Sequence, residues 1–354
     1  MAAAQVAVVA AAVAAALAPV PAGLVERVYA RGVYPPLQRG LTTLSNLTGV
    51  AIFDPLVIVA GAGLICLVIA RLRQARRRGW RRAVGRAAAD LAVAASIVYL
   101  AFLALWGLNY RREPLSRQLD FDAARVDAAS LARMLDTATD ELNRLAPLAY
   151  AAPWPALDDL RRVMAPAYAE AQADLGQGGA VPGRPKRTLL SWYFGRAAID
   201  GMTDPFALEV LVNREVLPFE RPFVVAHEWG HLAGYAAESE ASFAGWLTCL
   251  RGGPQQQYSG WLVLFLHLVG NVPQADARDR IARLDERPRE DMRAVIRRVS
   301  GSTPVVRETA RRVYDRYLKA NRVPSGVRSY DEVVLLVVGT SFEPGFRPVR
   351  RGRP

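Results

Sequence analysis

The sequence predicts a mainly helical chain with a small β-sheet, an α+β class in which apolar N-terminal helices precede a water-facing domain. Three observations predict this class. Apolar and charged residues are both frequent, at 52% and 22%, and they are segregated along the chain. Apolar stretches in the first third approach the roughly 20 residues that cross a ~30 Å hydrocarbon core. After residue 109, helical periodicity alternates with short β-favouring runs.

Three apolar stretches are expected to form transmembrane helices, at about 2–20, 50–70 and 91–108. The first also resembles a signal peptide, because the small residues of ALAPVPAG could form a cleavage site. It lacks the basic segment that normally comes first, so we expect a retained span. The segment 71–87 carries eight arginines between two apolar stretches, which is typical of a cytoplasmic loop.

The charge distribution also predicts partners and location. A net charge of +12 could fit nucleic-acid binding, but the arginines cluster between apolar runs and no base-reading motif accompanies them. We therefore expect a lipid bilayer as partner and no nucleic acid. With 71–87 inside, residues 109–342 form an extracytoplasmic domain of a multi-pass protein of the cytoplasmic membrane. The Pro/Arg/Gly-rich residues 343–354 are expected to be a disordered basic tail.

The domain after residue 109 shows several expected elements. Amphipathic helices are predicted over 121–145 and 157–175, and a glycine- and proline-rich loop over 176–185. Within 187–216, the runs LLSWYF and LEVLVN favour short strands. A helical region over 222–250 follows, and the apolar run 258–269 is too short to span a membrane and predicts a buried helix.

The run HEWGH carries the chemistry of this sequence. His227 and His231 lie four residues apart, so on an α-helix their imidazoles lie one turn apart on the same face and can bind one Zn²⁺. Glu228 is turned about 100° from His227, so it does not ligate but can accept a proton from metal-activated water. Chance matches to this short pattern are common. An apolar approach, FVVA, favours a buried helix in which two histidines and a glutamate need a metal as partner.

A third ligand is expected downstream. On an unbroken helix, Glu238 would lie about 10 Å beyond His231 along the axis, too far to reach the same ion. The chain must therefore turn, and Gly234 can adopt the left-handed conformation that ends helices. We predict Glu238 as ligand and Glu240 as the carboxylate that holds an imidazole N–H. The two roles could be exchanged, and both carboxylates could instead be solvated.

These motifs resemble a known family. WGLNYRR, PFALEVLVN, HEWGH, ESEASF and SYDEVVLL together are similar to a bacterial integral-membrane family of unknown function with a gluzincin-like HExxH motif. The resemblance covers the chain from the second span to about Ser341. It implies a zincin-like metallopeptidase domain, with His227, His231 and Glu238 as zinc ligands and Glu228 as general base. Related gluzincins usually have Asp at the position of Ser242, whose hydroxyl can bond to an imidazole but carries no charge.

The expected function is a membrane-anchored, zinc-dependent metallopeptidase that hydrolyses peptides or proteins. PFALEVLVN could form a strand against which a peptide docks, or a plain core strand. Tyr258, His267 and Tyr330 could donate to an oxyanion, although each is more often a core residue. An intramembrane protease is disfavoured because HEWGH lies among charged residues. A non-catalytic zinc-stabilised scaffold or sensor is the alternative, and the sequence offers no phosphate-binding loop to support a phosphatase or polar-lipid hydrolase.

Overall fold

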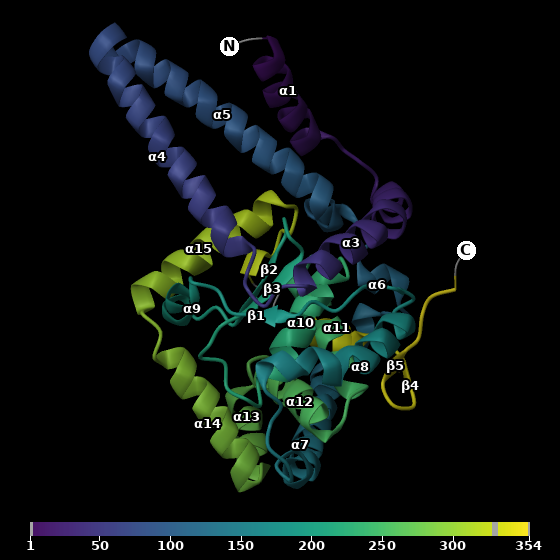
Figure 1. The fold of residues 1–354 in the computed structure, drawn as a ribbon. Helices are drawn as coiled ribbons and strands as arrows, with labels where there is room; N and C mark the ends of the chain where they lie inside the picture. Colours follow the sequence, from purple (N-terminus) through teal and green to yellow (C-terminus); the bar gives the residue numbers. More distant parts are fainter. Residues whose placement is uncertain (1–2, 328–331, 353–354) are drawn as a thin grey trace.

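The structure is a computed structural model that describes residues 3–327 and 332–352. It is mainly helical with two small sheets, as the sequence predicts. Figure 1 shows two long helices that project from a larger helical domain, with the C-terminal segment running along the outside of that domain.

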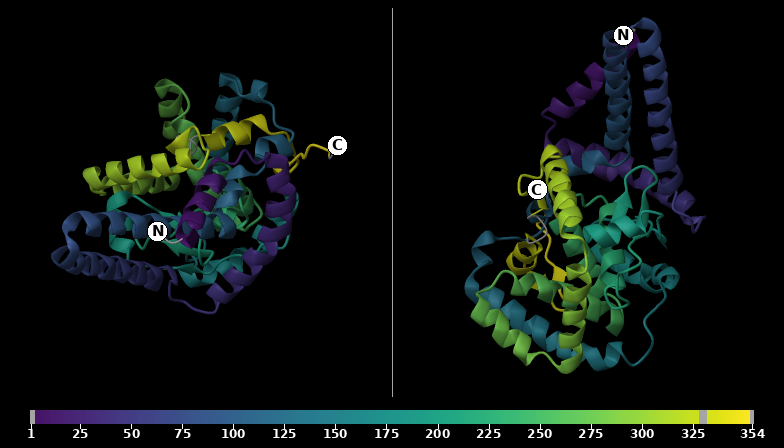
Figure 2. Two further views of the ribbon diagram at one scale, coloured as in Figure 1. Left: turned by 90° about the horizontal axis from the view of Figure 1, so that it is seen from above. Right: turned by 90° about the vertical axis from the view of Figure 1, so that its left-hand side faces the viewer.

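Two helices are long and apolar enough to cross a membrane. They are α4 (Phe53–Arg78) and α5 (Trp80–Leu105), with hydropathies of 2.3 and 2.1 over apolar windows of which 0% and 17% are buried. Both views in Figure 2 show them side by side, pointing away from the domain. By length and composition these helices fit a membrane location. The expected span 50–70 corresponds to α4, which begins at residue 53. The expected span 91–108 corresponds to α5, which ends at residue 105.

The first apolar stretch forms a shorter helix than the other two. α1 (Ala3–Leu17) has 15 residues, so it is long enough for a membrane span only together with the helical segment Ala22–Asn46, from which it is bent by 110°. That segment consists of α2 (Ala22–Leu24), the π-helix η1 (Val25–Val33) and α3 (Tyr34–Asn46).

The arginine-rich segment 71–87 is helical and not a loop, which corrects the sequence-based expectation. The chain reverses at Gly79 alone, whose φ of 83° is readily accessible to glycine. The arginines on either side extend the last turns of α4 and the first turns of α5. Arginine is a good helix former, so the two helices continue beyond their apolar portions.

The domain is built on helices that surround an aromatic core. Three tryptophans of this core are almost fully buried, namely Trp229, Trp246 and Trp261. The expected helices over 121–145, 157–175 and 258–269 correspond to α7 (Ala128–Ala149), α8 (Leu160–Asp174) and α12 (Pro254–Val269). The elements before the sheet are η2 (Gly107–Arg111), α6 (Leu115–Gln118), η3 (Ala123–Arg125), α7 (Ala128–Ala149), η4 (Leu157–Asp159) and α8 (Leu160–Asp174). The helices after the sheet that pack on them are α10 (Arg221–Leu232), α11 (Glu238–Leu250) and α12 (Pro254–Val269).

One small sheet of three strands lies beside α10. Its strands are β1 (Pro185–Lys186), β2 (Gly201–Asp204) and β3 (Glu209–Val212), in the order β1-β3-β2. β3 is fully buried, pairing parallel to β1 and antiparallel to β2, with Met202 opposite Leu211. LEVLVN therefore forms the central core strand, and the interpretation of it as a docking strand is wrong. LLSWYF is also not a strand, because its last four residues begin the helix α9 (Ser191–Ala197).

The C-terminal part covers one side of the domain. Its helices are α13 (Gln274–Arg283), α14 (Glu286–Ser300), α15 (Pro304–Ala320) and α16 (Glu332–Gly339). The expected disordered tail is ordered over its described part: β4 (Phe342–Glu343) and β5 (Arg347–Pro348) form a hairpin, and the Arg351 amide donates to the Gln118 carbonyl at 3.0 Å. Backbone pairing holds this segment in spite of its polar composition.

Candidate metal centre

Two helices in close contact carry the residues of the site. α10 contains HEWGH and α11 begins at Glu238. Their backbones approach closely at two glycines, since a Cβ at Gly230 would lie 2.8 Å from the Ala241 carbonyl oxygen and one at Gly245 would lie 2.8 Å from the His227 amide nitrogen. This crossing places the start of α11 against the histidine face of α10.

The chain turns at Gly234, as predicted. Gly234 has a φ of 89°. The Tyr235 amide donates to the Gly230 carbonyl at 3.1 Å, and the Gly234 amide donates to the His231 carbonyl at 2.9 Å. This pair of bonds is the Schellman arrangement that ends helices with a left-handed glycine. The turn brings the carboxylate of Glu238 back to the imidazoles.

His227, His231 and Glu238 form a cluster that could hold a metal ion. One ligand atom from each lies within 4.8 Å of the others. Glu238 Oε2 is 3.2 Å from His227 Nε2 and 3.4 Å from His231 Nε2. The exposed fractions of the three residues are 9%, 7% and 1%. The cluster is therefore shielded, and its three donor atoms converge from two helices.

The hydrogen bonds behind the imidazoles fit a cation at this point. His231 Nδ1 lies 2.8 Å from the Tyr235 carbonyl oxygen, which can only accept, so Nδ1 carries the proton. In the neutral imidazole, Nε2 then has a lone pair that faces the carboxylate oxygen of Glu238. Two acceptors facing each other in a buried site need a positive charge between them. A metal ion supplies that charge, and a nitrogen–nitrogen–oxygen donor set suits Zn²⁺.

The pKa shifts in the cluster have the same origin. Burial opposes a charged imidazole, yet the Glu238 carboxylate raises the pKa of His231 to about 9. Burial alone would raise the pKa of Glu238, but the His231 and His227 imidazoles hold it well below its usual range. Without a metal, a proton on the imidazole thus takes the place of the cation. Metal binding must displace this proton.

Glu228 lies beside the cluster and not in it. The residue is 4% exposed, and Thr203 Oγ1 on β2 donates to Glu228 Oε2 at 2.8 Å. A Cβ at Gly201 would lie 2.6 Å from Glu228 Oε1, so the glycine leaves room for this carboxylate. Burial raises the pKa of the Glu228 carboxyl, opposed by His227 and His231. A carboxylate of raised pKa, held next to the cluster, is suited to accept and return a proton.

Glu240 and Ser242 were both expected behind the imidazoles, and of these two Ser242 contacts a ring while Glu240 does not. Ser242 Oγ lies 3.1 Å from His227 Nδ1, so the serine hydroxyl bonds to this ring. Glu240 instead accepts from the Leu115 backbone amide at 2.7 Å, and burial raises the pKa of its carboxyl. The role of imidazole partner assigned to Glu240 is therefore corrected. Glu240 is two positions from both Glu238 and Ser242 on α11, which is about 200° round a helix, so it bonds to the segment that follows α5.

Three contacts to the site were not foreseen from the sequence. The Tyr314 hydroxyl on α15 donates to Glu238 Oε1, Thr203 holds Glu228, and Trp106 Nε1 donates to the His231 carbonyl at 3.0 Å. Of the oxyanion donors considered, Tyr258 lies in the core and donates to Asp291. Tyr330 lies outside the described residues.

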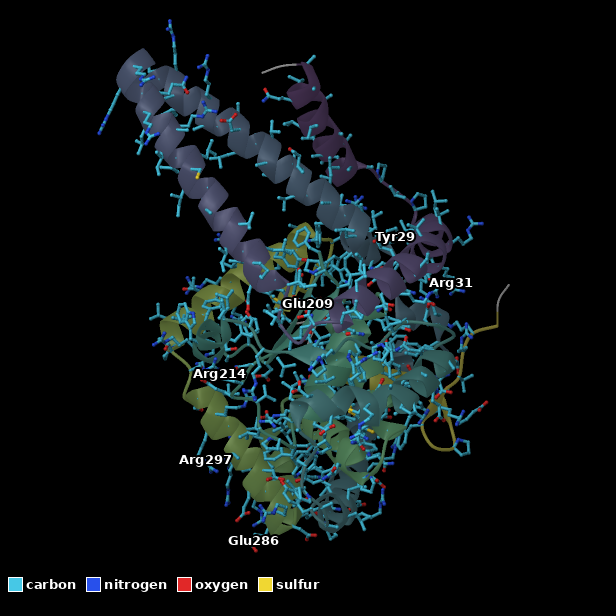
Figure 3. All side chains as sticks on the ribbon, viewed as in Figure 1. Tyr29, Arg31, Glu209, Arg214, Glu286 and Arg297 are labelled. Carbon is cyan, nitrogen blue, oxygen red and sulfur yellow. The ribbon has the colours of Figure 1, made fainter. Side chains whose placement is uncertain are left out.

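The cluster lies next to the end of α5. Trp106 directly follows this helix, and its ring packs edge-on against His231 with centroids 6.1 Å apart. Tyr29, labelled in Figure 3, lies near the foot of α5 and donates to the Ala104 carbonyl at 3.0 Å. The candidate metal centre therefore lies at the same end of the domain as the two apolar helices.

Comparisons with known proteins identify a family for the chain. The sequence model of a family described as "Protein of unknown function (DUF3810)" matches residues 29–338. This range contains α4, α5 and every residue of the cluster. No curated protein and no solved structure matches the chain.

Proposed function

We propose that this chain, which belongs to the DUF3810 family of proteins of unknown function, is a membrane-anchored, zinc-dependent metallopeptidase. The observation that carries the proposal is the buried cluster of His227, His231 and Glu238, whose donor atoms lie within 4.8 Å of one another. Glu228 on the same helix interacts with the two histidines but is not one of the three residues of the cluster. Three protein ligands and a separate carboxylate are the parts that a hydrolytic zinc site requires.

In the proposed hydrolysis, the metal would activate water and the side chains would transfer protons and orient the ligands. Zinc held by this donor set supplies Lewis acidity and makes water nucleophilic near neutral pH. Glu228 takes the proton of the attacking water and passes it to the leaving amine. The Thr203 hydroxyl holds Glu228 Oε2 in place, and the Tyr235 carbonyl and Ser242 hydroxyl orient the two imidazoles.

A peptide substrate is supported by the outer strand β2. The sheet order β1-β3-β2 makes β2 an edge strand, and it packs on α10. Gly201 and Thr203 of this strand lie against Glu228. An extended peptide that paired along β2 would pass the carboxylate, and edge strands bind peptides in this way. β2 takes the role that the sequence suggested for LEVLVN.

The substrate is proposed to lie at the membrane surface. Trp106, which contacts His231, is the first residue after the apolar helix α5. Tryptophan is enriched at the boundary between membrane and water. If α4 and α5 span a bilayer, the scissile bond reaches the metal near the lipid headgroups. Proteins with segments close to the membrane are therefore the expected substrates, on the extracytoplasmic side.

A non-catalytic zinc-stabilised scaffold is the second candidate. It is favoured by the burial of all three donor residues, because structural zinc sites are closed. Glu228 favours the peptidase over the scaffold, since a structural zinc site does not require a buried carboxylate that is not a ligand.

The test is metal analysis and peptide hydrolysis by the full-length protein in detergent micelles, with fluorogenic peptide mixtures and labelled casein. Glu228→Gln should keep the metal and lower the hydrolysis rate by about 10²–10⁴-fold, as expected for loss of a general base. Glu240→Gln is the matched control, because this glutamate is also buried but bonds to Leu115; both metal and rate should be retained.

The other outcomes separate the alternatives. A wild-type protein that binds zinc stoichiometrically but cleaves no peptide supports the scaffold. Hydrolysis of a phosphate ester or phospholipid in place of peptides would change the substrate class but not the metal site. A purified protein that binds no metal would eliminate both zinc functions.

A further inference from the structure

α15 crosses the candidate metal centre as a largely exposed helix. Of its residues, Leu318 alone is buried. It is held at its two ends: the Thr303 amide donates to the Arg196 carbonyl at 3.0 Å, and Arg322 Nη2 donates to the Ala18 carbonyl at 2.9 Å. Figure 1 shows α15 running from α14 and α9 towards the base of the two long helices. The helix packs beside α9, and its Tyr317 is packed against the core of the domain.

Tyr314 is the residue of α15 that reaches the site. Its hydroxyl donates to Glu238 Oε1, whereas the imidazole nitrogens of His227 and His231 face Glu238 Oε2. The two oxygens of one carboxylate thus have different partners. Glu238 is 1% exposed, so water does not replace the tyrosine as a donor to Oε1.

Aromatic packing fixes the orientation of the tyrosine. The rings of Tyr314 and Tyr317 are stacked, with centroids 5.8 Å apart and an interplanar angle of 17°. Tyr317 in turn packs edge-on against Phe102 of α5 and Tyr110 of η2, at 6.1 and 6.0 Å. The last turn of the apolar helix α5 is therefore connected through two rings to the carboxylate of the cluster.

We infer that Tyr314 is a positioning residue of the metal centre: it holds Glu238 Oε1, so that Oε2 is directed at the ion between the two imidazoles. The inference rests on the metal site of the proposed function. A carboxylate ligand that is free to rotate loses conformational entropy when it binds, and it can change between one-oxygen and two-oxygen coordination. Outer hydrogen bonds to metal ligands typically contribute 10–100-fold to metal affinity.

The experiment measures zinc affinity in the metal-stripped full-length protein, by competition with a chromophoric chelator. Tyr314→Phe keeps the ring and removes the hydroxyl, so the zinc dissociation constant should rise about 10–100-fold. Tyr150→Phe is the matched control, because its hydroxyl also donates to a carboxylate, that of Asp291 at 2.6 Å, outside the cluster; its zinc affinity should stay within about twofold of wild type. The Co²⁺-substituted Tyr314→Phe protein should also show an altered ligand-field spectrum.

A double-mutant cycle distinguishes positioning from general support of the fold. If Tyr314 acts through Glu238, Tyr314→Phe should have no further effect on zinc affinity in a Glu238→Ala background. The unfolding midpoint of the metal-free protein should be similar in Tyr314→Phe and Tyr150→Phe, since each variant loses one hydrogen bond from a tyrosine to a carboxylate.

Two results would overturn the inference. They are a zinc affinity of Tyr314→Phe within twofold of wild type, and a loss that adds fully to that of Glu238→Ala. Either result leaves the proposed function standing, provided that Glu238→Ala itself weakens zinc binding measurably. Failure of the wild-type protein to bind any metal would remove the proposed function and this inference together.

Discussion

Gly234 shows how one backbone conformation decides the geometry of the cluster. Its φ of 89° costs a residue with a Cβ about 1–2 kcal/mol. A Cβ there would also lie 3.0 Å from Asn109 Oδ1 and 3.2 Å from Arg112 Nη1. Arg112 Nη1 donates to the Gly234 carbonyl at 3.1 Å, so the turn is enclosed on both sides. The residue that reverses the chain between His231 and Glu238 must therefore be a glycine.

Gly234→Ala is predicted to destabilise the protein by at least about 1–2 kcal/mol and to weaken metal binding. The reason is that the strained turn can relax only by shifting Tyr235, whose carbonyl orients His231, and with it the start of α11. Thermal unfolding with and without zinc would measure both effects. Gly178→Ala is the control, since Gly178 has an ordinary φ and open space around it. Equal unfolding midpoints for the two variants would contradict this account.

At the scale of elements, the crossing of α10 and α11 depends on two glycines. Gly230 is the fourth residue of HEWGH and Gly245 lies two turns into α11; each faces the backbone of the other helix. The close approach allows Glu238 and Ser242, one turn apart on α11, to contact the histidines of α10. Any side chain at the crossing would separate the two ligand-bearing helices.

Gly245→Ala is predicted to lower zinc affinity by tenfold or more while the helices themselves remain formed. The added methyl group would lie 2.8 Å from the His227 amide nitrogen and 3.0 Å from its Cα, so α11 must move away from α10. Chelator competition measures the affinity, and circular dichroism measures helix content. Gly40→Ala, a helical glycine of α3 with open space around it, should leave zinc affinity unchanged. Unchanged affinity in Gly245→Ala would mean that the cluster tolerates separation of the helices.

At the scale of the whole molecule, the arginines and the metal centre occupy opposite ends of the α4–α5 hairpin. The arginines surround the turn at Gly79, and Trp106 at the other end contacts His231. Each helix has 26 residues and is about 39 Å long, enough to cross the bilayer. Positive charge is retained on the cytoplasmic side. We therefore expect the domain with the metal centre on the extracytoplasmic side.

Cysteine labelling of intact cells tests this orientation. In a Cys66→Ser background, Ile296→Cys on α14 should react with a membrane-impermeant maleimide, because Ile296 is 52% exposed. Arg82→Cys, near the arginine-rich turn, should react only after the membrane is opened. Cys249 should stay unlabelled in both, since it is buried and burial raises the pKa of its thiol. Labelling of position 82 alone in intact cells would reverse the proposed topology.

The sequence predicts those features of the molecule that depend on the local spacing of residues along one element. The spacing of His227 and His231 and the rise of a helix were sufficient to predict a break at Gly234 and the return of Glu238. Hydropathy was sufficient for α4 and α5. Arginine composition predicted a loop where the helices in fact continue, because charge patterns report solvent exposure and not backbone conformation.

Only the tertiary structure decided the residues around the three donor atoms. Tyr314 is 76 positions from Glu238, on a basic helix whose tyrosines at 314 and 317 are no specific signal of a site. The choice of Ser242 over Glu240 as imidazole partner depends on how α11 is rotated against α10. By itself the sequence determined which side chains can share a metal, since helix geometry is local. Long-range packing determined which groups hold those side chains, because hydrogen bonds between distant segments depend on how the elements pack.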